Sequence, residues 1–249
     1  MATDLQAKLH FSRFEFKYVL SRALREQVEA ELGHFVELDP YVQGQPHQQY
    51  FVRSLYFDDP QYTSFREKQD GQHSRSKFRI RTYARTITDP APWFLEIKGR
   101  YNNLVFKHRS PFTGEFDLRA CGYDLCRATL AHADAGAVRH QFEFELYRRQ
   151  LRPVVLVDYE RRPYVSRFDP EFRLTFDCQL QTTATDTMFP AHGAAMRALV
   201  PGYTVMEVKF RYRMPSWFHR IIQAFELRRV SISKICTGTQ ALGLQLDPN

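Results

Sequence analysis

The stretch SKFRIRTY alternates basic and apolar side chains, and this alternation constrains the fold more than any other feature of the sequence. Successive side chains of a β-strand point to opposite faces. Lys77, Arg79 and Arg81 therefore share one face of the predicted strand. Phe78 and Ile80 share the other. One face must pack on a hydrophobic core, while the other meets either water or an anion.

Several other segments repeat this pattern, with largely apolar side chains opposite the charged ones. The charged faces are Arg13/Glu15/Lys17, Lys77/Arg79/Arg81, Glu96/Lys98/Arg100, Arg161, Arg173/Asp177 and Glu207/Lys209/Arg211. Together these faces hold eleven Lys or Arg and four Asp or Glu. Their net charge is therefore +7, which equals the net charge of the whole chain. The positive excess of this protein therefore lies on strand faces.

The periodicity predicts a strand-rich α+β protein. Predicted strands cover residues 13–20, 50–59, 76–84, 93–100, 104–112, 153–165, 172–180 and 204–212, and predicted helices cover 22–33, 124–133, 138–150 and 215–227. Short connections between the third, fourth and fifth strands favour an antiparallel meander. Residues 230–238 are predicted as a short strand or a loop. Because no linker divides the chain, residues 1–249 are predicted to form a single domain.

Two arrangements fit the strand pattern equally well. In an open sheet, helices cover the apolar face and the basic face meets solvent. In a closed barrel, the apolar face points outward to the helices and the basic face lines a tunnel. Like charges held together in a tunnel repel one another, so the second arrangement requires a bound anion.

Composition narrows the class of partner. The isoelectric point of about 9.3 favours an anion such as phosphate, nucleic acid or a membrane surface. Nucleic acid is disfavoured, because most aromatic side chains of these strands lie opposite the cations instead of beside them. Four cysteines without metal-binding spacing predict free thiols, and the sequence has neither a signal-like nor a membrane-spanning apolar run, so a cytoplasmic location is expected.

Two carboxylates deserve separate interpretation. Glu96 in LEIK and Glu207 in MEVK each precede a lysine by two positions, which places acid and amine on the same strand face. This pattern fits local ion pairing on a solvated sheet. It also fits a carboxylate that holds a divalent cation against phosphate oxygens. The Arg-x-Arg spacing of FRIRTY favours phosphate, which a guanidinium binds with two parallel hydrogen bonds.

Nine short motifs, in order, resemble the VTC domain, the catalytic domain of the vacuolar transporter chaperone polyphosphate polymerase in the CYTH-like triphosphate tunnel superfamily. They are RFEFKY, SLYFD, KFRIRTY, LEIKGR, DYERRPY, FRLTFD, VMEVKF, MPSWF and SISK. The resemblance implies a closed antiparallel β-tunnel of about eight strands with flanking helices. Where the wider superfamily has a first acidic residue, this chain has Arg13.

The resemblance also implies site residues. Catalytic phosphate contacts would come from Arg79, Arg81, Lys98, Arg161, Arg173, Lys209 and Lys234; further substrate contacts from Lys17, Arg100, Lys107, Tyr159 and Ser233; and the metal would be held by Glu207. One further tunnel position of the family aligns with either Lys107 or Arg109.

The activity implied is metal-dependent transfer of the γ-phosphoryl group of ATP to a growing polyphosphate chain, with Mn²⁺ expected before Mg²⁺. Expected ligands are ATP and polyphosphate or tripolyphosphate, and a separate membrane protein would have to carry product across a membrane. The residues alone also fit a triphosphate or polyphosphate hydrolase, or a polyphosphate-binding module without catalysis.

Overall fold

The computed structural model describes residues 13–102, 104–117, 119–191 and 194–246. Its strands are β1 (Phe14–Ser21), β2 (Val36–Leu38), β3 (Tyr50–Asp58), β4 (Ser74–Thr82), β5 (Trp93–Tyr101), β6 (Leu104–Pro111), β7 (Arg152–Ser166), β8 (Arg173–Ala184), β9 (Arg197–Ala198) and β10 (Tyr203–Phe210). Its α-helices are α2 (Arg22–Leu32), α3 (Thr63–Gln69), α4 (Gly122–His132), α5 (Ala137–Arg149), α6 (Ser216–Ala224) and α7 (Lys234–Ala241). Two 3₁₀ turns, η1 (Pro40–Val42) and η2 (Pro46–Gln48), precede β3. All eight predicted strands are present.

Eight strands form one antiparallel path in the order β1-β10-β8-β7-β3-β4-β5-β6, with β2 and β9 pairing on β7 and β8. The two ends of this path meet. The backbone N–H of Arg13 donates to the carbonyl of Val105 at 3.2 Å, and the N–H of Val105 donates to the carbonyl of Arg13 at 3.0 Å. This bridge between β1 and β6 closes the sheet, so the barrel alternative is the correct one.

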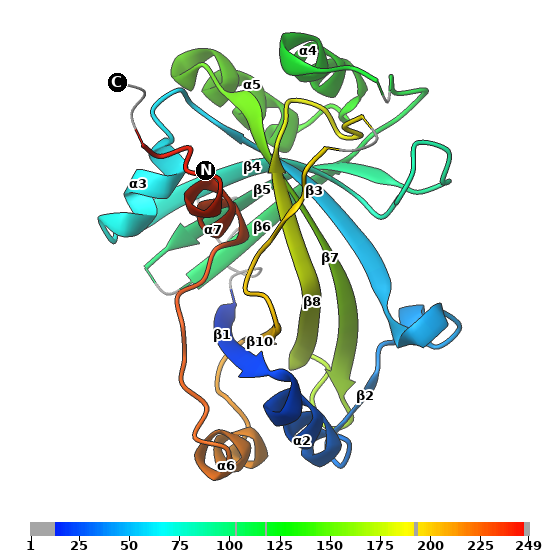
Figure 1. Cartoon of the computed structure of the whole chain (residues 1–249), viewed down its shortest axis with the longest axis vertical. Coiled ribbons are helices and arrows are strands. Elements are labelled where there is room, and N and C mark those ends of the chain that lie inside the picture. The colour runs from blue at the N-terminus through cyan, green and yellow to red at the C-terminus, as the bar shows by residue number, and fades with distance from the viewer. Residues whose placement is uncertain (1–12, 103, 118, 192–193, 247–249) are drawn as a thin grey trace, which may run out of the picture.

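The apolar strand faces pack against helices, which lie outside the barrel in Figure 1. Helices α2 and α6 cover one side of the barrel, where Trp217 and Phe218 pack against Phe172 and Phe176. Helices α4 and α5 cover the opposite side, where Phe142 is fully buried over β3 to β5. The apolar face of each strand is thereby removed from water, and this leaves the charged face inside.

The first helix illustrates how local sequence sets these boundaries. The backbone N–H of Leu24 donates to the Ser21 hydroxyl at 3.3 Å, so Ser21 caps α2. Val28 and Leu32 are the buried residues of this helix, and Gly33 ends it. The segment 138–150, whose sequence also alternates like a strand, is helical as predicted.

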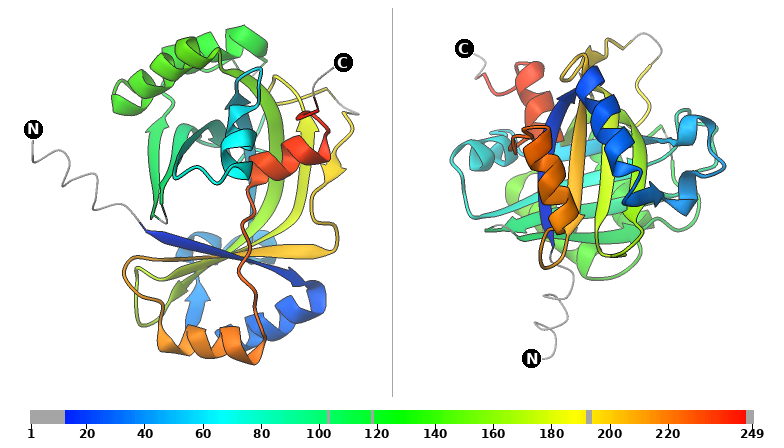
Figure 2. Two further views of the ribbon diagram at one scale, coloured as in Figure 1. Left: turned by 90° about the vertical axis from the view of Figure 1, so that its left-hand side faces the viewer. Right: turned by 90° about the horizontal axis from the view of Figure 1, so that it is seen from below.

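The C-terminal segment differs from the prediction of a short strand or loop at 230–238. Residues 228–233, here called the strap, are extended and join α6 to α7, and the chain becomes helical from Lys234 (Figure 2). Helix α7 packs tightly into the barrel. A Cβ atom at Gly238 would lie 2.9 Å from both Val155 and Thr182, closer than real contacts allow. Glycine at 238 therefore permits this close packing, which overrides the strand preference of the preceding β-branched residues.

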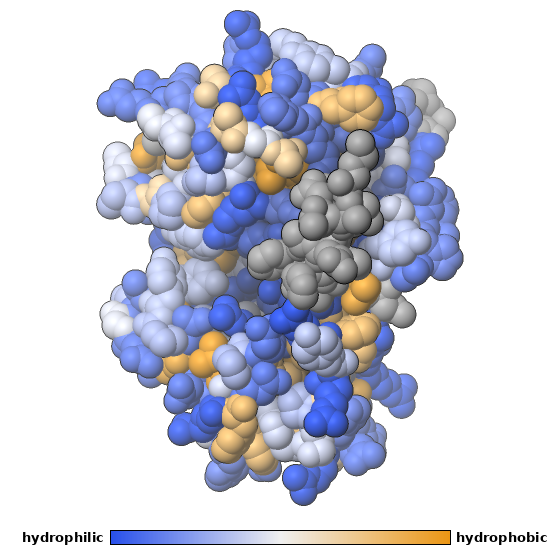
Figure 3. Space-filling model, turned by 180° about the vertical axis from the view of Figure 1, so that it is seen from behind, coloured by the Kyte–Doolittle hydropathy of each residue, from blue (hydrophilic) through white to orange (hydrophobic). Residues whose placement is uncertain are grey.

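The surface is consistent with a protein that buries its apolar groups in these layers. Figure 3 shows one face that is mainly hydrophilic, with apolar side chains in small separate patches. In the described part of the chain, no helix combines the length and apolar composition needed to span a membrane. All four cysteines are free thiols, as predicted.

Candidate functional site

The inside of the barrel contains a cavity of about 510 Å³. Fourteen Lys or Arg side chains and two Glu side chains are among the described residues that line it. They come from β1, β4, β5, β6, β7 and β10, together with α3, the strap and the start of α7. Strand alternation brings the strand residues of this set together, because in each strand every second side chain points inward, whereas packing of α3, the strap and α7 adds the others.

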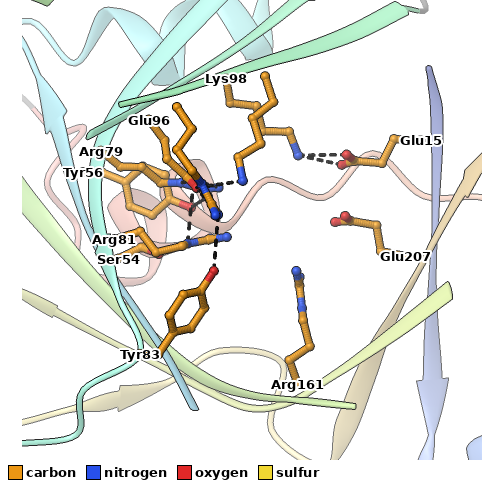
Figure 4. Close-up of polar contacts among 12 residues, drawn as sticks. Glu15, Ser54, Tyr56, Arg79, Arg81, Tyr83, Glu96, Lys98, Arg161 and Glu207 are labelled. Carbon is orange, nitrogen blue, oxygen red and sulfur yellow. Dashed lines mark hydrogen bonds and ion pairs between the residues drawn. The ribbon is translucent and has the colours of Figure 1, made fainter. Parts of the chain in front are cut away.

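One side of the cavity, here called the arginine wall, consists of Arg79, Arg81, Lys107 and Arg109 around the buried Glu96 (Figure 4). Strand register explains this grouping, because Glu96 of β5 is paired with Arg79 of β4 and with Arg109 of β6. The Glu96 side chain has no exposed surface.

Both oxygens of Glu96 accept hydrogen bonds. Arg79 donates to Oε2 through Nε at 2.8 Å and Nη2 at 2.6 Å. Arg109 donates through Nε to Oε1 at 2.8 Å, and Lys107 Nζ lies 2.7 Å from the same oxygen. Burial raises the pKa of Glu96, but the surrounding cations outweigh burial and hold the pKa well below its usual range. Glu96 therefore stays ionised and orients the guanidinium groups toward the cavity.

Hydroxyl groups fix the remaining guanidinium donors of the arginine wall. Arg79 Nη1 donates to the Tyr56 hydroxyl at 3.0 Å. Arg81 donates to Ser54 Oγ at 3.1 Å and to the Tyr159 hydroxyl at 3.0 Å. Burial raises the pKa of Tyr56, but Arg79, Arg81 and Lys234 together lower it to about 8. This phenol is therefore a strong hydrogen-bond partner for a cation or a phosphate oxygen.

The opposite side, here called the carboxylate wall, consists of Glu15 and Glu207 with Lys17, Lys98 and Lys209. Figure 4 shows the two acids and Lys98. Lys98 Nζ donates to both oxygens of Glu15, at 2.7 and 2.9 Å. Lys209 Nζ lies 2.5 Å from Glu207 Oε1. Lys17 Nζ lies 3.3 Å from Glu15 Oε1 and 3.7 Å from Glu207 Oε2, so it sits between the two acids.

Both acids of the carboxylate wall are ionised. Burial and the nearby Glu207 carboxylate raise the pKa of Glu15, but the three lysines outweigh both effects and lower it to about 2. The lysines hold the pKa of Glu207 well below its usual range in the same way, against burial. For Lys98, burial dominates and lowers the pKa to about 8 despite the neighbouring acids.

A fourth buried carboxylate, Asp177, organises the part of the cavity near α7. Asp177 accepts hydrogen bonds from Arg161 Nε at 2.6 Å and Nη2 at 2.7 Å, and from Lys234 Nζ at 2.5 Å. The Lys234 ammonium also lies 4.5 Å from the centre of the Tyr159 ring. Burial raises the pKa of Asp177, and its two cationic partners lower it to far below the usual value. Asp177 therefore orients these cations as Glu96 orients Arg79.

The strap completes the wall beside β1. The backbone N–H of Val230 donates to the carbonyl of Lys17 at 2.8 Å, and Lys17 Nζ donates to the carbonyl of Ile232 at 3.0 Å. Lys77 Nζ donates to the Ser233 hydroxyl at 2.6 Å. The strap thus lies along the edge of β1 that is not paired with β10, beyond the bridge between Arg13 and β6, and adds hydrogen-bonding groups to the cavity.

The structure gathers nearly all of the residues that the sequence suggested. Those that line the cavity are Lys17, Arg79, Arg81, Lys98, Arg100, Lys107, Tyr159, Arg161, Glu207, Lys209, Ser233 and Lys234. The structure describes all of the suggested residues, and among them Arg173 is the exception. It is exposed at the start of β8 and does not line the cavity. For the alternative of Lys107 or Arg109, both side chains contact Glu96.

Several site residues escaped the sequence assignment. Glu15 precedes Lys17 by two positions, the same spacing that marks Glu96 and Glu207, and this signal could have identified it. Ser54 and Tyr56 carry no charge, so charge alternation does not detect them. Asp177 and Glu96 were recognised as charged positions, but their role as buried partners depends on cross-strand register that the sequence does not show.

The carboxylate wall suits a divalent cation. Among the described residues, no three His, Cys, Asp or Glu side chains cluster into a metal site made of protein alone. Two carboxylates that face a phosphate-sized cavity are nevertheless a typical donor set for Mg²⁺ or Mn²⁺, which commonly bind one or two carboxylates together with substrate phosphates and water. Glu15 and Glu207 both line the cavity and fit this requirement.

Comparison with known proteins agrees with the fold. The VTC domain model matches residues 12–243. A proposed adenylate cyclase from Bacillus halodurans is 13% identical, with a TM-score of 0.51 over 89% of this chain and 93% of that chain. A Pyrococcus horikoshii protein is 11% identical (TM-score 0.44; 87% and 92% covered), and the Mimivirus capping enzyme triphosphatase is 6% identical (TM-score 0.37; 90% and 94% covered). No curated protein sequence matches this chain. At this identity, the Bacillus halodurans structure supports a shared fold and no particular activity.

Proposed function

We propose that this chain, which belongs to the VTC domain family, is a polyphosphate polymerase that transfers the γ-phosphoryl group of ATP to a growing polyphosphate chain. The observation that carries the proposal is the enclosed cavity lined by fourteen basic and two acidic side chains. Such an excess of buried positive charge is stable only with compensating negative charge, which a phosphate chain supplies at every unit. Triphosphate and polyphosphate chemistry is also what the family membership implies.

The arginine wall and the carboxylate wall would have different roles in phosphoryl transfer. The transition state of this reaction is loose and spreads negative charge over the equatorial oxygens, so catalysis requires positioning and charge stabilisation more than a protein nucleophile. Arg79 and Arg81 are fixed by buried partners and would bind the phosphates bidentately. Lys98, Lys209 and Lys17 have flexible stems and would adjust to the moving γ-phosphoryl group.

The reaction balances without a protein base. The bond between the γ-phosphorus and the β,γ-bridging oxygen breaks, and a terminal oxygen of the polyphosphate chain forms the new bond to that phosphorus. ADP keeps the bridging oxygen and its electron pair. Because the attacking phosphate oxygen is already deprotonated at neutral pH, no proton has to be moved. The absence of a Ser-His-Asp or Cys-His arrangement among the residues that line the described cavity is consistent with this chemistry.

Glu15 and Glu207 would hold the divalent cation. When bound there, the cation would supply positive charge that neutralises part of the charge developing during transfer. Mn²⁺ is proposed before Mg²⁺ on the family resemblance alone. A cytoplasmic location is likewise proposed and rests on the sequence.

The test is to incubate purified protein with ATP and Mn²⁺, separate the products on a polyphosphate gel, and assay released phosphate in parallel. A ladder of long chains that disappears in Glu207→Gln supports the polymerase. Free phosphate without a ladder indicates the hydrolase. Tripolyphosphate binding without either product indicates a polyphosphate-binding module.

A further inference from the structure

The inward face of β4, β5 and β6 changes character from one end of the tunnel to the other. Strand register defines successive layers, because directly paired residues lie at the same height. From one end the layers are Arg75/Arg100/Val105, Lys77/Lys98/Lys107, Arg79/Glu96/Arg109 and Arg81/Phe94/Pro111. Tyr83, two residues beyond Arg81, follows the last of these layers. The inward face of these strands therefore has a basic end, which lines the cavity, and an aromatic end, which adjoins it.

The basic end continues the charged cavity to its edge. Arg75 and Arg100 pair across β4 and β5, and Arg13 bridges to Val105 beside them. All of them line the cavity. Within the described part of the lining, the aromatic side chains are Tyr56 and Tyr159. Both lie deeper in the barrel, since Tyr56 pairs with Arg79 and Tyr159 contacts Arg81.

The aromatic end is a connected group of partly buried rings. The ring centres of Tyr50 and Tyr83 are 5.5 Å apart, and those of Tyr83 and Phe94 are 6.4 Å apart. The guanidinium of Arg109 lies 4.0 Å from the centre of the Phe94 ring, and its Nη2 donates to the Tyr83 hydroxyl at 3.2 Å. Exposed Tyr41 extends the group, with its ring 5.3 Å from that of Tyr50.

The aromatic group adjoins the phosphate-binding layers directly. Phe94 is paired with Arg81, and Tyr50 is paired with Arg161. The rings therefore begin in the layer of the last arginines, and Tyr83 lies two residues, or about 6.7 Å, further along β4's direction than Arg81. A ligand with phosphates on Arg79 and Arg81 would place its next chemical group against these rings.

We infer that the aromatic end (Tyr50, Tyr83 and Phe94 with Arg109) receives the base and ribose of the nucleoside triphosphate, and that the polyphosphate chain occupies the basic end. This inference rests on the proposed function and adds a direction to it. A purine has two π faces and no charge, so it gains from stacking on rings and on a guanidinium plane. At the basic end it would cover cations without neutralising them.

The orientation of the nucleotide determines from which end the acceptor chain approaches. With the base at the aromatic end, the γ-phosphate points toward the layer of Lys77 and Lys98 and toward the carboxylate wall. The acceptor chain then approaches from the basic end and extends back through it after each transfer. ADP leaves through the aromatic end, so product chain and spent nucleotide do not pass each other.

The experiment compares the affinities of the full chain for ATP and for tripolyphosphate by isothermal titration calorimetry. Tyr83→Leu should weaken ATP binding at least about fivefold, as expected for loss of one stacking partner. The same variant should leave tripolyphosphate affinity unchanged. Tyr83→Phe, the matched control, keeps the ring and should retain the ratio of the two affinities. Arg75→Gln should weaken binding of long-chain polyphosphate and leave ATP binding unchanged.

A variant-free measurement supports this comparison in case Tyr83→Leu does not fold. Photocrosslinking of the unmodified protein with an azidoadenine analogue of ATP should label peptides that contain Tyr50, Tyr83 or Phe94. Labelling of the Arg75 or Arg100 peptides would overturn the inference, and so would an unchanged affinity ratio in folded Tyr83→Leu. If the unmodified protein bound neither ATP nor tripolyphosphate, the proposed function would fail, and this inference with it.

Discussion

The arginine wall and the carboxylate wall face the same cavity and use acidic residues in opposite ways. In the arginine wall a single carboxylate, Glu96, is fully buried and shared by several cations. In the carboxylate wall two carboxylates, Glu15 and Glu207, line the cavity. The first acid is committed to holding protein cations in place. The second pair remains in contact with the space where a ligand binds.

The choice of cation differs in the same way. Arginine predominates around Glu96, and its planar fork makes several directed hydrogen bonds at once. Lysine surrounds Glu15 and Glu207, and its flexible stem allows the ammonium to move from carboxylate to phosphate. The comparison suggests that one wall is a preorganised phosphate clamp and that the other rearranges around metal and substrate.

The strongest test of this difference is removal of the buried charge. Glu96→Gln leaves the guanidinium groups of Arg79 and Arg109 without their counter-ion, and such a change in a buried network typically costs about 3–5 kcal/mol of unfolding free energy. Tripolyphosphate should restore part of this loss, because it supplies negative charge to the same cations. Urea unfolding with and without tripolyphosphate measures both effects. A variant as stable as the unmodified protein without ligand would contradict the role of Glu96.

The second test concerns the carboxylate wall. Glu207→Gln should reduce phosphoryl transfer at least about a hundredfold, because the metal loses a charged ligand. Tripolyphosphate binding without metal should stay equal or become tighter, since a negative charge has been removed from an anion site. Activity and binding are measured on the same preparation. Glu37→Gln, at an exposed position of β2, serves as the matched control. Equal loss of binding and activity would mean that Glu207 acts structurally.

Much of the fold could be read from the sequence, because the two-residue period of a strand reports directly which side chains share a face. The closure of the barrel could not be read from this periodicity, which fits an open sheet equally well, and was predicted only through the family resemblance. It depends on the bridge between Arg13 and Val105, which are far apart in the chain. The helix at 234–241 was also missed, because its approach to β7 depends on Gly238 and not on local preference.

In the site, too, some features could be predicted from the sequence pattern and others depend on contacts between distant residues. Basic residues such as Arg79 and Lys209 were found from alternation and family resemblance, because they carry the charge that the pattern detects. The role of Glu96 was left between ion pair and metal ligand, since only cross-strand register shows that Arg79 and Arg109 flank it. Arg173 belongs to a charged strand face but lies where β8 begins, so alternation could not tell it from a residue deeper in the barrel.

The third test compares a buried and an exposed arginine from these faces. Arg81→Ala removes charge-assisted hydrogen bonds worth about 1.5–3 kcal/mol, so tripolyphosphate affinity should fall about 10-fold to 150-fold. Arg173→Ala should reduce it by less than about fivefold, because an exposed charge acts only at long range, and added salt should abolish the effect. Calorimetric titration at two salt concentrations distinguishes them. Similar losses at both positions would place Arg173 in contact with the phosphates.

The smallest expected effect is a dependence on pH that belongs to the arginine wall. Burial lowers the pKa of Lys107 to about 6, with Arg81 and Arg79 opposing the attraction of Glu96. At pH 7 this amine is therefore mostly neutral in the free protein. A bound polyanion favours the charged form of Lys107 and raises its pKa. Tripolyphosphate binding should therefore take up close to one proton at Lys107, and this contribution to affinity should weaken as the pH rises.

Calorimetry at pH 7 in two buffers of different ionisation enthalpy measures the proton uptake. Lys107→Met should lose that proton together with affinity, whereas Lys107→Arg, which is always charged, should lose the proton but keep the affinity. Protons taken up by the ligand itself or by Lys98 are the same in the unmodified protein and in both variants, so the difference between the proteins reports Lys107. An unchanged uptake in both variants would show that Lys107 is already charged before the anion binds.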